Sequence, residues 1–151
     1  MKIPRKIAIL CVAILLFAII TGCQRTYDYS FEQSLDNVEK VEICRYDDNS
    51  QSTTTIAVLS KTDADSLLTE IDAMECRRYF GDGTMDYGEV VIYITYADQT
   101  AEVIGLHNVA KVDKDGDWHI GVEYFNAQQI CALIMKYVDA ELLPDLSKYY
   151  D

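Results

Sequence analysis

The chain has 151 residues, with 25 acidic against 13 basic side chains and a formal net charge of −12. This length is enough for one domain with its own hydrophobic core. The acidic excess argues against nucleic-acid binding, because that function needs a basic surface to neutralise phosphates. We interpret the many acids as a means of solubility rather than as a specific site.

The N-terminus has the pattern of an export signal. Basic residues among the first six positions precede the uncharged apolar segment 7–20. At about 1.5 Å per residue this segment is too short for a hydrocarbon core of about 30 Å, but it is typical of a secretory signal peptide. The small residues Thr21 and Gly22 follow, and then Cys23.

The sequence Ile20-Thr21-Gly22-Cys23 resembles the lipobox of bacterial lipoproteins. The resemblance implies that a diacylglycerol is attached to the Cys23 sulfur, which as a thiolate can be alkylated, and that a signal peptidase removes residues 1–22. It also implies a location on the extracytoplasmic face of the bacterial cell membrane, held there by lipid. An ordinary signal peptide or a short anchor with a chance cysteine is the alternative.

The mature chain would carry ten basic and 25 acidic residues, because the leader holds three basic residues and no acidic ones. We therefore expect no second, electrostatic attachment to anionic lipid. Three cysteines remain besides the lipidated one, with no CxxC motif. One disulfide with a free thiol and three buried thiols are both open interpretations. Cys76 precedes two arginines, but we do not expect it to be catalytic.

In chain order, the polar and aromatic segment 23–37 predicts a lipidated tether. The alternation of 38–46 and the β-branched run 53–59 predict two strands of a hairpin. A helix over 63–74 follows, capped by Thr62 with Asp65 as its capping-box partner.

A short strand is expected at 76–80, followed by a loop bracketed by Gly81 and Gly88. The strongest strand pattern is 89–96, with 90, 92, 94 and 96 facing one side and 91, 93 and 95 the other. Further strands are expected at 101–106, 109–112 and 118–123, the second of these either continuing the first or standing alone. Asn126 caps a last helix that ends before Pro144, and 144–151 is expected to be a loose tail.

The element order ββ-α-β-ββ(β)β-α predicts a two-layer α+β sandwich, with a mainly antiparallel sheet and two helices, over residues 38–143. The second face of such a sheet could stay partly open to solvent.

The best metal candidate is the alternating set Asp113, Asp115 and Asp117, because calcium prefers oxygen ligands. The EF-hand pattern fails, however, since Trp118 and Tyr124 occupy the positions that need Gly and Glu. We favour a solvated hairpin turn and expect no calcium and no other cofactor.

Enzymatic chemistry finds little support in the sequence. The two histidines, His107 and His119, lie in or near strands, and the chain contains no GxSxG, HExxH or Gly-rich phosphate motif. We therefore expect a protein without catalytic activity.

Eleven tyrosines and one tryptophan are more suggestive of binding. Most should pack the sheet, but Tyr87 and Trp118 border the glycine loop and the acidic turn, where large aromatic residues suit binding of a protein or a glycan. We predict a binding or interaction module of the cell envelope with these two residues as anchors. An envelope enzyme or calcium-dependent module, and an accessory subunit of a membrane complex, are the alternatives.

Overall fold

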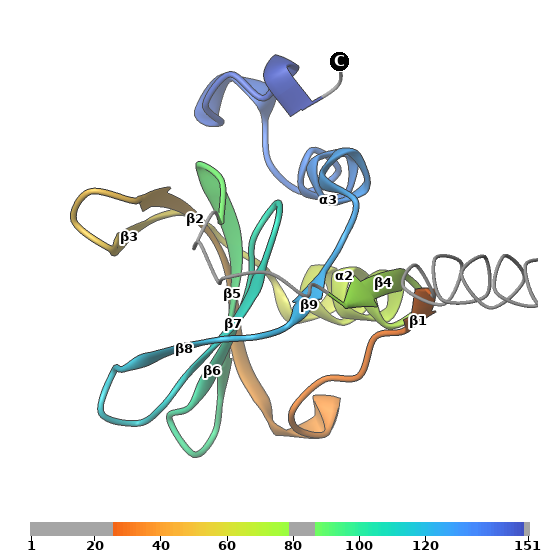
Figure 1. Cartoon of the computed structure of the whole chain (residues 1–151), viewed down its shortest axis with the longest axis vertical. Coiled ribbons are helices and arrows are strands. Elements are labelled where there is room, and N and C mark those ends of the chain that lie inside the picture. The colour runs from red at the N-terminus through yellow and green to blue at the C-terminus, as the bar shows by residue number, and fades with distance from the viewer. Residues whose placement is uncertain (1–25, 79–86, 150–151) are drawn as a thin grey trace, which may run out of the picture.

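The computed structural model describes residues 26–78 and 87–149, which form an α+β sandwich (Figure 1). The leader, Cys23, the tip of the glycine loop and residues 150–151 lie outside the described residues. One layer is a six-stranded antiparallel sheet in the order β3-β2-β5-β6-β7-β8. Its strands are β2 (Val38–Asp47), β3 (Ser52–Val58), β5 (Val90–Tyr96), β6 (Ala101–Ile104), β7 (Val109–Val112) and β8 (Trp118–Ile120).

The second layer holds both helices, α2 (Lys61–Asp72) and α3 (Ala127–Ile134), together with a three-stranded sheet (Figure 1). That small sheet has the order β1-β4-β9, with strands β1 (Thr26–Asp28), β4 (Glu75–Arg78) and β9 (Glu123–Tyr124). Short 3-10 turns cover Leu35–Asn37, Ala140–Leu142 and Ser147–Tyr149. The predicted fold class is confirmed.

Strand β5 lies in the interior of the large sheet, between β2 and β6, and follows the predicted alternation. Val90, Ile92 and Ile94 belong to the core under the helices, whereas Val91 and Tyr93 belong to a separate cluster on the other face. The period of two in the sequence therefore divides this strand between two cores.

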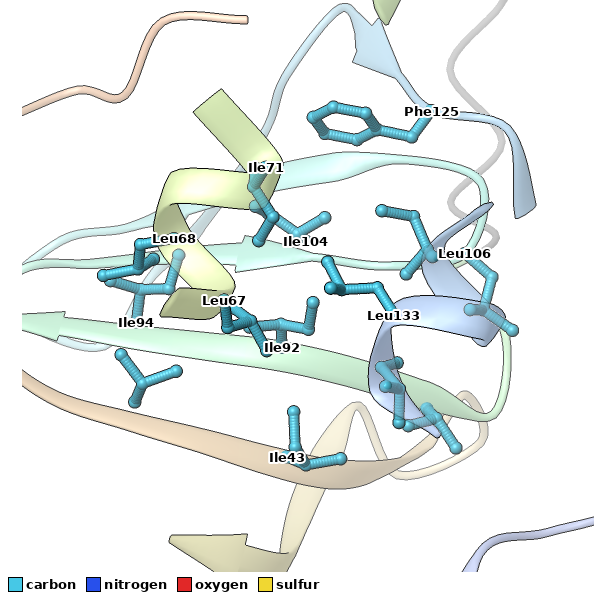
Figure 2. Packing of buried hydrophobic residues seen from close by; sticks show 14 of the residues in the cluster. Ile43, Leu67, Leu68, Ile71, Ile92, Ile94, Ile104, Leu106, Phe125 and Leu133 are labelled. Atoms are coloured by element: carbon cyan, nitrogen blue, oxygen red, sulfur yellow. The ribbon is translucent and has the colours of Figure 1, made fainter. Parts of the chain in front are cut away.

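Helix α2 buries its apolar stripe on the large sheet. Figure 2 shows Leu67 and Leu68 of this helix packed over Ile92 and Ile94. The predicted cap is wrong by two residues, because the Ser60 hydroxyl accepts from the backbone N–H of Asp63 and donates to its carboxylate. The S-x-x-D arrangement that caps the helix thus lies two residues earlier than the predicted T-x-x-D.

Helix α3 begins as predicted, with the Asn126 side chain accepting from the backbone N–H of Gln129. It ends at Ile134, earlier than the apolar stripe indicates, because the next N–H groups close tighter turns, such as Lys136 to the carbonyl of Leu133. Val138 is still buried, so its hydrophobic pattern reflected core packing rather than helix.

Residues 26–37 are not a tether. Strand β1 pairs with β4, and Tyr29 is only 5% exposed. The expected loose tail is also packed: Leu146 is buried, and the ring of Tyr149 lies 5.5 Å from that of His107. Both segments bury aromatic or aliphatic side chains against the rest of the core. The local sequence pattern does not show this burial, because it depends on contacts with distant segments.

The second face of the large sheet is closed by curvature. The ring centroids of Tyr46 on β2 and Trp118 on β8 are 5.6 Å apart, although three strands separate β2 from β8. The sheet therefore curls around this face and forms a second, smaller core instead of the partly open surface expected. Its buried members are Cys44, Tyr46, Tyr87, Val91, Ala101, Val103, Ala110 and Val112.

Candidate functional site

Four rings of the curled face form what we call the aromatic cluster: Tyr46, Tyr87, Tyr93 and Trp118. Trp118 stands at its centre, with ring centroids 5.4 Å from Tyr87, 5.6 Å from Tyr46 and 6.2 Å from Tyr93. Such edge-on and tilted packing favours a rigid arrangement. The two predicted anchors, Tyr87 and Trp118, are thus in contact.

The two predicted anchors, Tyr87 and Trp118, differ in their exposure. Tyr87 is fully buried, so it is not an exposed anchor, and burial raises the pKa of its hydroxyl to about 12. Its hydroxyl has no hydrogen-bond partner among the described residues. The backbone of Tyr87 crosses close to β6, where a side chain on Gly105 would lie 2.6 Å from the Tyr87 carbonyl oxygen. Trp118 is partly exposed and remains a candidate for contact with a ligand.

Two clefts adjoin the aromatic cluster, and Tyr46 lines both. The first, which we call the rim cleft, has a volume of about 600 Å³ and lies where the β2–β3 and β7–β8 turns meet. Trp118 forms its aromatic wall, and its polar lining is supplied by Ser50, Gln51, Asp117 and His119. The second cleft, of about 730 Å³, is lined by Arg45, Asp48, Tyr87, His107 and Tyr149, among others.

The acidic turn is stabilised by contacts of the Asp113 carboxylate. The Asp113 carboxylate accepts from the backbone N–H groups of Asp115 and Asp117, at 2.9 and 3.0 Å, and lies 3.1 Å from Nε2 of His119. The His119 contact and these amides lower the pKa of Asp113. Gly116, with φ of +90°, allows the chain to reverse. Within the described ranges no three His, Cys, Asp or Glu side chains gather into a metal site.

The histidines lie in different clefts, His107 beside Tyr149 and His119 beside Asp113. Cys44, Cys76 and Cys131 are free, buried thiols, which agrees with the open interpretation of three core thiols. Burial raises the pKa of all three, that of Cys44 to about 11. A nucleophilic thiol needs the opposite shift, so the arginines after Cys76 do not activate it.

Sequence reasoning missed a buried carboxylate, Glu102 on β6, which is 1% exposed. Its oxygens accept from the hydroxyl of Tyr29 at 2.6 Å, from the hydroxyl of Tyr96, and from the backbone N–H of Glu32 at 3.0 Å. Lys111 forms an ion pair with Glu32. These hydrogen bonds and this ion pair connect segment 29–32 to the large sheet. The signal was present, because position 102 shares a strand face with Ile104 and should therefore be apolar.

The chain has no significant match among known protein families, characterised proteins or solved structures. Across residues 26–78 and 87–149, no helix is long and apolar enough to cross a bilayer.

Proposed function

We propose that this chain is a lipid-anchored protein of the extracytoplasmic face of the bacterial membrane, which binds a polar envelope ligand at the rim cleft and has no catalytic role. Acylation of Cys23 would supply the anchor. The observation that carries the binding site is the partly exposed Trp118, held by three tyrosines at the wall of a cleft of about 600 Å³.

The lining of the rim cleft favours an uncharged ligand with both apolar and hydroxyl faces. An aromatic ring offers an apolar contact, while Ser50, Gln51, Asp117 and His119 offer hydroxyl, amide, carboxylate and imidazole groups. Among the described residues that line this cleft there is no lysine or arginine, which disfavours a phosphate or another anion. Sugars present apolar C–H faces beside hydroxyl groups, so we propose an envelope glycan as the ligand class.

The ligand can be tested through Trp118, the only tryptophan in the chain. The lipidated protein in detergent micelles is titrated with soluble cell-wall glycan fragments while tryptophan emission is recorded. We expect a saturable change, and we expect His119→Ala to weaken binding about tenfold through loss of one polar contact. The matched variant His107→Ala, in the other cleft, should bind normally.

An unchanged emission spectrum at all concentrations would refute the glycan site. Equal weakening by both histidine variants would refute its placement in the rim cleft. Crosslinking in native membranes tests the alternative of an accessory subunit, which should be recovered with one integral membrane protein in fixed proportion.

The anchor is tested separately with Cys23→Ser. Stable attachment by acyl chains requires two chains or a second signal. The variant should remain unprocessed or leave the detergent-rich phase. Normal processing and normal phase partitioning of Cys23→Ser would refute lipidation.

A further inference from the structure

The folded domain begins very close to the expected anchor. Cys23 lies three residues before Thr26, the first residue of β1, and three residues span at most about 10 Å. If Cys23 carries lipid, as proposed above, the end of the small sheet that holds Thr26 must lie at the headgroups. Thr26 is opposite Arg77 on β4, and Arg77 is opposite Tyr124 on β9.

Two arginines, Arg77 and Arg78, lie at this end of the small sheet, where Glu123 of β9 is opposite Arg78. Arg77 and Arg78 are exposed, and neither lies within ion-pair distance of a described carboxylate. The other end of the β1–β4 pair is acidic, with Asp28 opposite Glu75. By contrast, many of the lysines pair with acids, namely Lys40, Lys61, Lys111, Lys136 and Lys148.

Aromatic residues and a cleft accompany these arginines. The guanidinium of Arg78 lies 5.9 Å from the centroid of the Tyr27 ring. A cleft of about 480 Å³ opens beside β4 and β9, and its lining includes Thr26, Glu75, Arg77, Tyr124 and Gln129. Tyrosines beside cations are typical of the membrane interface, where an amphipathic ring lies at the level of the headgroups.

We propose that the end of the small sheet formed by Thr26, Arg77, Arg78 and Tyr124 is a docking surface for anionic phospholipid headgroups. This proposal departs from our expectation, based on net charge, of no electrostatic attachment to anionic lipid. At physiological ionic strength charges are screened beyond about 8 Å, so the side chains nearest the bilayer act on it more strongly than the net charge does. Figure 1 shows β1 and the β7–β8 turn on opposite sides of the domain. Docking therefore directs the rim cleft away from the membrane.

The test measures which end of the lipidated protein approaches the bilayer. A fluorophore is attached at Gln129→Cys, in the cleft beside Arg77, or at Lys114→Cys, in the β7–β8 turn. The native thiols Cys44, Cys76 and Cys131 are buried and should not react. Each labelled protein is reconstituted into phosphatidylcholine vesicles, with or without phosphatidylglycerol, that carry a nitroxide quencher on the headgroups.

We expect quenching at position 129 to exceed that at 114 about twofold or more in vesicles with phosphatidylglycerol, and to decrease with added salt. Arg77→Glu with Arg78→Glu should abolish this excess. Arg45→Glu with Lys61→Glu makes the same change in net charge away from the small sheet and should preserve it.

Equal quenching at the two positions, or an excess that neither salt nor the Arg77 and Arg78 changes reduce, would overturn the docking surface. The salt and lipid comparisons use the native arginines, so they hold even if the reversed variant fails to fold. Mass spectrometry separates the two proposals. An unacylated Cys23 refutes the anchor and, with it, the premise of docking, whereas an acylated protein with equal quenching refutes docking alone.

Discussion

Replacing Glu102 by glutamine should destabilise the domain, although it only exchanges one carboxylate oxygen for an NH₂ group. The carboxylate accepts three hydrogen bonds in the core, from the hydroxyls of Tyr29 and Tyr96 and from the backbone N–H of Glu32. A carboxamide has a single acceptor oxygen, so its NH₂ group must face a donor. A tyrosine hydroxyl can rotate to accept from that NH₂, but the remaining bonds lose their charge-assisted strength.

Loss of charge assistance should cost about 1 kcal/mol for each of the three hydrogen bonds, and the rotation of a hydroxyl recovers part of this loss. We therefore expect Glu102→Gln to lower the free energy of unfolding by about 2 kcal/mol. For a domain of this size that corresponds to a melting temperature lower by about 8 °C. Glu102→Met leaves all three donors without a partner and should cost about 3–6 kcal/mol, a large part of the stability of a typical domain.

Urea unfolding followed by circular dichroism measures both values, with Glu39→Gln, an exposed residue of β2, as the matched control. A double-mutant cycle with Tyr29→Phe should show coupling between the two positions, because they share one hydrogen bond. The reasoning is refuted if Glu102→Gln unfolds within about 0.5 kcal/mol of the native chain, since that is the range of ordinary surface changes.

Three further predictions concern the core. Leu68→Asp should lower the free energy of unfolding by about 4 kcal/mol or more, because it places a carboxylate where the side chain is 2% exposed. Ser66→Asp, on the exposed face of α2, is the control in the same denaturation assay, and equal stability of the two variants would contradict the packing. The Cys44 thiol, with its pKa raised to about 11 by burial, should react with a disulfide reagent at mildly alkaline pH only in denaturant, whereas rapid labelling of the native protein would show that it is accessible. Burial, and then Glu102, raise the pKa of the Tyr29 and Tyr96 hydroxyls. The contribution of these hydroxyls to the free energy of unfolding is therefore complete below the tyrosine pKa of the unfolded chain, about 10, and is lost as the pH rises above that value. A free energy of unfolding that stays constant from pH 9 to about 12 would contradict this direction.

The sequence by itself determined the elements whose side chains repeat with a regular period. The alternation of β5 correctly assigned Ile92 and Val91 to opposite faces, and the stripe through Leu67 and Leu68 identified the buried side of α2. Asn126 was recognised as a cap because the capping bond reaches only three residues along the chain. These features are local, so the amino-acid order is enough to show them.

Only the tertiary structure decided the features that join distant segments. Segment 26–37 lacks a period, and its place in the fold depends on pairing with β4 and on Glu102, which lies 73 residues from Tyr29. Tyr87 and Trp118 have similar signals in the sequence, yet the curvature of the large sheet buries one and leaves the other partly exposed. Glu102 is a polar residue at a core position that the sequence reasoning missed. Its partners could not be named from the sequence, because which chain segments meet is set by packing of the whole domain rather than by any local pattern.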